Sequence, residues 1–246
     1  MSSLVKLCAY CGTRPATENE HVVAKIFYVD QPRNGITVPS CTDCNRGRGD
    51  DGPRDLHLDE EYLRNALCVA EGTRHHPIAA ALGEGKVIRS FARSLGLAAS
   101  FWNASGLTEF RTEGGIFEPY SSPYFYVDFP RVQRVLRKIT KGLFYWGTGR
   151  HFPPDYLVLA NPMVRPDEIP ALEDKLNAIG STGFQDADEY GVFRFMLAAE
   201  KGKITRTQWL MQFYDWAIFH TRTLPRGEVS TGDTGMPIVS KLEIFR

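Results

Sequence analysis

The amino-acid sequence predicts an α+β protein in which a small cysteine-containing module precedes a larger mixed domain. Residues 1–52 are rich in turn-forming residues and contain four of the five cysteines. Residues 53–246 instead carry apolar side chains at both helical and strand spacing. Glycine, proline and acidic residues crowd positions 47–53, between the two parts. We therefore predict a small module at 1–52 and an α+β domain of unknown role at 53–246.

Apolar periodicity predicts the individual elements of both parts. Within the module, extended segments are expected at 22–28 and 36–38. Asp128 is the expected N-cap of one helix in the larger domain, and Gly180 follows the end of another. The helices expected there are 58–70, 86–102, 130–146 and 166–179. The expected extended segments are a hairpin at 108–120 around a glycine turn, a strand at 156–160, an antiparallel pair at 190–199 and 208–221, and a last strand at 238–245. For 208–221, a helix is the alternative.

The overall charge is balanced, with 29 basic and 29 acidic residues. Such a chain has no global positive field to attract a polyanion, so any contact with nucleic acid must come from a local patch. The N-terminal residues lack the apolar core of a signal peptide, and no later stretch reaches the roughly 20 apolar residues that span a bilayer. We expect a cytoplasmic protein without a membrane partner.

Four cysteines form two C-x-x-C pairs, Cys8 with Cys11 and Cys41 with Cys44. In a reducing compartment this spacing indicates a metal site rather than disulfides. Two such turns supply the four sulfur ligands of a closed tetrahedral Zn²⁺ site, which is the structural rather than the catalytic kind. Cys68 lies in an apolar helical segment, where we expect a small buried side chain.

Glu20 and His21 lie between the cysteine pairs, and Asn45 follows the last cysteine directly. This pattern resembles the zinc-containing HNH (ββα-metal) endonucleases, in which an acidic residue and a histidine on a strand face a histidine or asparagine on a helix. The resemblance covers residues 8–50, and residues 45–50 also resemble the equivalent turn in RNA-guided DNA nucleases. Glu20 replaces the usual aspartate. Ile36 stands where the family has its middle asparagine. Asn34 could replace it through a loop shift, but we favour an exposed turn residue at Asn34 and a backbone carbonyl that orients the imidazole.

The resemblance implies a metal-dependent endonuclease that hydrolyses phosphodiester bonds, acting in bacterial or phage defence. His21 would take a proton from water, while Glu20 and Asn45 would hold Mg²⁺ or Mn²⁺. We expect nucleic acid as the partner, DNA in preference to RNA. Two other functions stay open: a non-catalytic zinc module that binds nucleic acid or protein, and a regulatory partner of another nuclease.

Basic side chains are the candidates for holding substrate. Arg46 and Arg48 lie in the turn after the last cysteine. Four more basic residues lie opposite the apolar stripe of the helix at 130–146, and they are either phosphate contacts or a solvated face: Arg131, Arg134, Lys138 and Lys141. His57 is expected at the surface, His75 and His76 in a loop, and the acidic run at 59–61 in the first turn of a helix.

Overall fold

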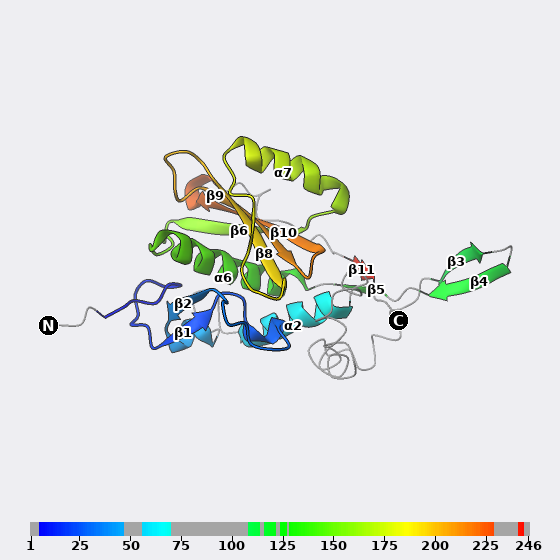
Figure 1. The fold of residues 1–246 in the computed structure, drawn as a ribbon, viewed down its shortest axis with the longest axis horizontal. Helices are drawn as coiled ribbons and strands as arrows, with labels where there is room; N and C mark the ends of the chain where they lie inside the picture. The colour runs from blue at the N-terminus through cyan, green and yellow to red at the C-terminus, as the bar shows by residue number, and fades with distance from the viewer. Residues whose placement is uncertain are drawn as a thin grey trace.

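The computed structural model describes residues 5–46, 56–69, 108–113, 116–121, 124–126, 128–228 and 241–243. Helices and antiparallel sheets are both present, so the predicted α+β class is confirmed. The largest element is a five-stranded antiparallel sheet with the order β6-β10-β9-β8-β7 (Figure 1). Its strands are β6 (Tyr156–Met163), β7 (Phe184–Asp186), β8 (Phe193–Ala199), β9 (Thr207–Phe213) and β10 (Ala217–Pro225).

One helix covers each face of this sheet (Figure 1). Alternate residues of β8 point to opposite faces, so Phe195 packs with helix α6 (Phe129–Thr148) and Met196 packs with Leu176 of helix α7 (Ile169–Ala178). The Asp128 carboxylate caps α6 by accepting a hydrogen bond from the Arg131 amide, as predicted. The sheet is therefore buried on both sides.

The segment 208–221, predicted as one strand or a helix, is in fact two strands. The chain reverses between β9 and β10 at Tyr214 and Asp215, both of which have positive φ angles. Glycine or asparagine usually occupies such positions, so the apolar sequence gave no sign of a turn. Tyr214 is buried, and its hydroxyl donates a hydrogen bond to the Phe27 carbonyl at 2.8 Å. This contact holds the turn against the N-terminal segment.

The N-terminal segment contains a short antiparallel pair, β1 (Glu18–His21) and β2 (Thr37–Ser40), followed by the single helical turn α1 (Thr42–Asn45). The predicted extended segment at 22–28 is wrong, because Lys25–Phe27 forms a 3-10 turn. This segment packs directly on α6. A Cβ atom at Gly142 of α6 would lie only 2.9 Å from a methyl group of Val22. One hydrophobic cluster accordingly runs from the N-terminal segment through α6 to the sheet.

In Figure 1, helix α2 (Leu56–Val69) lies beside α6, whereas the hairpin of β3 (Thr108–Glu113) and β4 (Ile116–Ser121) lies at the far right, away from the sheet. Helix α2 packs against α6, and its bounds are close to the predicted 58–70. The predicted hairpin is present as β3 and β4, while β5 (Tyr124–Tyr126) pairs with β11 (Lys241–Glu243). The predicted helix at 86–102 and the pair at 75–76 lie outside the described residues. Within the described residues, no helix is both long and apolar enough to cross a membrane.

A buried histidine in the sheet makes stability sensitive to acid. One ring nitrogen of His220 lies 3.0 Å from the Asn161 amide nitrogen, and the other lies 3.1 Å from the Gln208 side-chain oxygen, which suits the neutral ring. Burial, helped by the positive charge of Arg222, lowers the pKa of His220 from 6.5 to about 4. Above pH 6.5 both folded and unfolded chains hold the neutral ring, so nothing is lost.

Between pH 6.5 and about 4 only the unfolded chain gains this proton, so the free energy of unfolding should fall by roughly 3 kcal/mol from His220 alone. The measurement is denaturant unfolding of wild type and His220→Gln across this pH range. The glutamine variant cannot titrate, so its unfolding free energy should fall less steeply with acid. Parallel pH curves for the two proteins would contradict the assignment.

Candidate metal centre and neighbouring cavity

The four paired cysteines come together as predicted. The Sγ atoms of Cys8, Cys11, Cys41 and Cys44 all lie within 4.8 Å of one another. Sulfurs around a tetrahedral zinc with Zn–S bonds of about 2.3 Å would be separated by about 3.8 Å, so the cluster could hold a zinc ion with a small contraction. Four thiolates favour a soft ion over magnesium or calcium. Three of the four cysteines are buried, which is typical of a structural site.

Tight backbone turns present these thiols. The Gly12 amide donates to the Cys8 carbonyl at 2.8 Å, and the Asn45 amide donates to the Cys41 carbonyl at 2.9 Å. Gly12 has a φ of +66°, and a Cβ atom there would lie 3.2 Å from the ring of His151. Both the left-handed backbone and this close contact require glycine. The first cysteine turn is thereby packed onto the segment that follows α6.

Neighbouring donors favour the thiolate form in the first cysteine turn. A hydrogen bond from the Cys44 thiol lowers the pKa of Cys8 to about 4, against the opposing effect of burial. Burial raises the pKa of Cys11, but hydrogen bonds from Thr13 and Arg14 outweigh it and bring that pKa to about 7. Arg14 also lies 3.6 Å from the Cys44 sulfur. Thiolate is the form that binds metal, so the first turn favours an ion. In the second turn, burial raises the pKa of Cys41, and the hydrogen bond to Cys8 raises that of Cys44, so both would give up protons to the ion on binding.

A separate cavity of about 330 Å³ adjoins the cysteine cluster. Glu20 and His21 at the end of β1 line it together with Asn45 of α1, so the structure brings the three predicted catalytic residues together. His57 and Glu60 of α2 also line this cavity. From the sequence we expected His57 only at the surface and Glu60 only in the first turn of a helix. Their three-residue spacing on one helix face was the available signal, but nothing in the sequence placed that face beside β1.

A buried lysine joins the two acidic residues of this cavity. Lys138 of α6 is only 6% exposed, and its ammonium group forms ion pairs with Glu20 and, at 2.6 Å, with Glu60. The second oxygen of Glu60 lies 3.2 Å from the His57 ring. Although burial opposes ionisation, Lys138 and His57 lower the pKa of Glu60, and the two carboxylates raise the pKa of Lys138. Two carboxylates and one ammonium leave this group with one net negative charge when ionised.

Glu20 differs from Glu60 because burial dominates and raises its pKa to about 7. One of its oxygens contacts Lys138, whereas Oε2 is buried without a hydrogen-bond partner among the described residues. The hydroxyl of Ser40, although close, donates to the Cys41 carbonyl. A buried oxygen of this kind needs a partner. Oε2 lies in the residue that lines the cavity together with Asn45, whereas both oxygens of Glu60 already have partners in Lys138 and His57.

The imidazole of His21 is half-buried beside this oxygen-rich region. Burial, with the nearby charge of Lys25, lowers the pKa of His21, which favours the neutral ring at pH 7. Gly35 allows the ring to lie close to the backbone, since a Cβ there would be 3.1 Å from His21 Cδ2. The Asn34 side chain is exposed, and its backbone N–H donates to the Glu189 carboxylate. The Ile36 backbone carbonyl accepts a hydrogen bond from the Val22 backbone N–H. These contacts agree with Asn34 being an ordinary turn residue.

The predicted basic stripe on α6 is corrected by the structure. Arg131 and Arg134 bind the buried carboxylate of Asp59 at 2.7 and 2.6 Å, and Lys138 is buried against Glu20 and Glu60. The acidic side chains come from α2 and β1, which pack on this side of α6. Three of the four cations are thus neutralised within the fold and do not form a free substrate surface.

Lys141, the fourth member of the stripe, lines a different cavity. Arg46 is exposed after α1, and Arg48 lies outside the described residues. No protein-family model, no curated protein and no solved structure matches this chain. The part of the expected HNH pattern that the structure shows is the four-cysteine cluster, which could hold a zinc ion.

Proposed function

We propose that this protein is a metal-dependent phosphodiester hydrolase of the HNH type, acting on nucleic acid and on DNA in preference to RNA. The observation that carries the proposal is the unpartnered Oε2 of Glu20, which shares one cavity with His21 and Asn45 beside the four-cysteine cluster. A buried carboxylate oxygen, a neutral imidazole and an amide are the groups that one-metal hydrolysis requires.

Each residue has a distinct role in the proposed reaction. His21, whose lowered pKa favours the neutral ring, would accept a proton from the attacking water. Glu20 and Asn45 would hold Mg²⁺ or Mn²⁺, and the bound ion would supply charge neutralisation at the phosphate and the leaving oxygen. Lys138 and Glu60 are positioning residues, because their ion pairs fix one oxygen of Glu20 and leave the other for the cation.

Replacing His21 with alanine should lower cleavage of plasmid DNA by about 10² to 10⁴, the usual contribution of a general base. Zinc content, fold and DNA affinity should stay as in wild type, because the ring is at the cavity surface rather than in the core. His220→Gln is the matched control above pH 7, since it alters a histidine in the sheet, remote from this cavity. Wild-type cleavage by His21→Ala would place the active site elsewhere.

The ion pair between Glu20 and Lys138 favours a second candidate function, a zinc module that binds nucleic acid without cleaving it. In that case Glu20 serves only to neutralise a buried lysine. Glu20→Gln distinguishes the two: a nuclease should need more magnesium for the same rate, whereas a binding module should change only in stability. A wild-type protein that binds DNA but leaves it intact with both Mg²⁺ and Mn²⁺ would favour the second function.

A further inference from the structure

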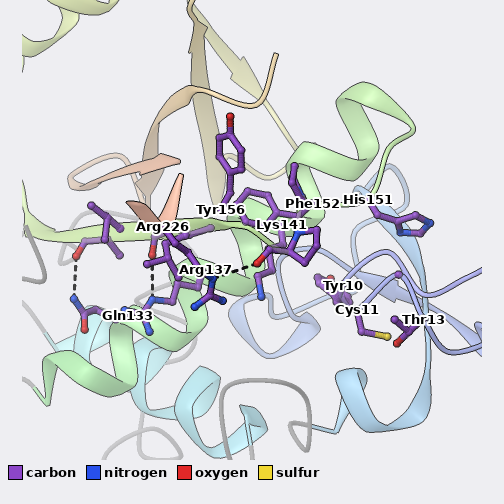
Figure 2. A pocket seen from close by; sticks show the side chains of 17 residues that line it. Tyr10, Cys11, Thr13, Gln133, Arg137, Lys141, His151, Phe152, Tyr156 and Arg226 are labelled. Carbon is purple, nitrogen blue, oxygen red and sulfur yellow. Dashed lines mark hydrogen bonds between the residues drawn. The ribbon is translucent and has the colours of Figure 1, made fainter. Parts of the chain in front are cut away.

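A second cavity, of about 520 Å³, lies between the first cysteine turn and the far side of α6. Figure 2 shows Tyr10, Cys11 and Thr13 at one side of it, with Arg137, Lys141 and Arg226 grouped nearby. The rest of its wall comes from the segment 151–154 and from β6. Among the described residues that line it, none is aspartate or glutamate. The cavity is consequently positive.

None of the three cations is neutralised by a described carboxylate, and hydrogen bonds to backbone carbonyls hold the two arginines in place. Arg137 donates through Nε to the Val158 carbonyl, and Arg226 donates through Nε to the Pro154 carbonyl, each at 3.2 Å (Figure 2). These bonds fix both guanidinium groups while leaving their terminal nitrogens for another partner. Among the described residues, no carboxylate forms an ion pair with Arg137, Lys141 or Arg226. This contrasts with the neighbouring basic residues of α6, which all have acidic partners.

Aromatic and polar groups complete the cavity. Phe152 and Tyr156 supply ring surfaces, and Pro153 and Pro154 add further apolar area. The Tyr10 hydroxyl and His151 Nδ1 are buried and lack hydrogen-bond partners among the described residues. Tyr10 is itself only 9% exposed. Rings and polar side chains therefore line the same cavity, which suits a ligand with both an apolar and a charged part.

We propose that this cavity binds a nucleotide through its phosphate. Arginine and lysine bind phosphate oxygens by charge-assisted hydrogen bonds, and aromatic rings stack on a base. The volume lies within the range of about 300 to 1,000 Å³ typical of small-molecule sites. The same chemistry recognises a free mononucleotide or one nucleotide of a single strand. The proposal is independent of the nuclease function, because the cavity is separate from the one that contains Glu20.

The test measures binding to the full-length, zinc-loaded protein without added magnesium. Adenosine 5′-monophosphate, adenosine and inorganic phosphate are titrated by calorimetry, and a fluorescein-labelled twelve-nucleotide thymidine strand is titrated by anisotropy. Lys141→Gln should weaken binding of the phosphate-bearing probe about tenfold, the usual loss for one charge-assisted contact. Lys175→Gln, an exposed lysine of α7, is the matched control and should bind as wild type.

The site is assigned to free nucleotides if adenosine 5′-monophosphate binds more tightly than adenosine. Lys141→Gln should then weaken this binding, and Lys141→Arg should retain it. Binding of the strand alone, with the same pattern among the variants, assigns it to a nucleotide within a strand. His21→Ala should bind as wild type in either case, so the site stands even if the nuclease proposal fails. No binding of either probe by the folded protein, or equal losses in Lys141→Gln and Lys175→Gln, would overturn the proposal.

Discussion

Replacing Cys41 with serine should remove bound zinc and unfold the N-terminal segment of residues 5–46. Structural zinc sites contribute roughly 10 to 16 kcal/mol when they form in zinc-finger peptides, far more than two short strands and one helical turn provide. The sheet should survive, because its strand pairing and its contacts with α7 do not involve this segment. Metal analysis and limited proteolysis of the purified protein measure the two effects separately.

Cys68→Ala is the control for the cysteine substitution. Cys68 is as buried as the cluster cysteines, but it lies in α2, outside the group of four sulfurs. This variant should keep about one zinc per chain and a protected N-terminal segment. Wild-type protein prepared without chelator that contains no zinc would disprove the metal assignment, and so would full zinc in Cys41→Ser.

Replacing Lys138 with methionine should destabilise the protein by about 3 to 5 kcal/mol at pH 7, the usual cost of breaking a buried ion pair. The substitution keeps the length of the side chain but leaves Glu20 and Glu60 buried without their cation. Without the ammonium, both carboxyl groups would have pKa values above those of the unfolded chain. The deficit should therefore be largest at neutral pH and shrink as the pH falls toward about 4.5, because the folded variant binds these protons before the unfolded chain does.

Denaturant unfolding at pH 7 and at pH 4 measures both parts of this expectation. Lys141→Gln is the control, because it removes a positive charge from the same helix without removing a described ion pair. Adding Glu20→Gln and Glu60→Gln to Lys138→Met should restore part of the lost stability, since none of these three positions then carries a buried charge. A loss below about 1 kcal/mol for Lys138→Met at pH 7 would mean that the ion pairs are not maintained in solution.

Local signals were enough to predict the parts of the fold that depend on neighbouring residues. The cysteine cluster follows from two short spacings, and α6 follows from apolar periodicity with Asp128 as its cap. The turn between β9 and β10 was missed because Tyr214 adopts a left-handed conformation that its residue type rarely favours. The hydrogen bond from Tyr214 to the Phe27 carbonyl supports that conformation, and no local sequence pattern predicts this contact.

The candidate site was predictable only where it adjoins the cysteines. Glu20, His21 and Asn45 stood out because two metal-binding turns enclose them in the sequence. Lys138 and Glu60 are 78 residues apart, and their pairing depends on how α2 packs against α6. From the sequence, Lys138 therefore looked like one cation of a solvated stripe. Helical spacing nevertheless places it beside the buried Val135 and Gly142, at the edge of the buried face.

The cysteine cluster has a practical consequence for enzymology, because it borders both cavities. Cys11 and Gly12 form part of the wall of the larger one, and Asn45, directly after Cys44, reaches into the smaller. If the proposed magnesium-dependent cleavage and the zinc site both hold, a chelator that stops cleavage by removing magnesium would also compete for the zinc, and the walls of both cavities would be affected. Inhibition by such a chelator therefore does not identify the ion that acts on the phosphate. That identification requires adding magnesium or manganese back to protein whose zinc content has been measured in the same sample.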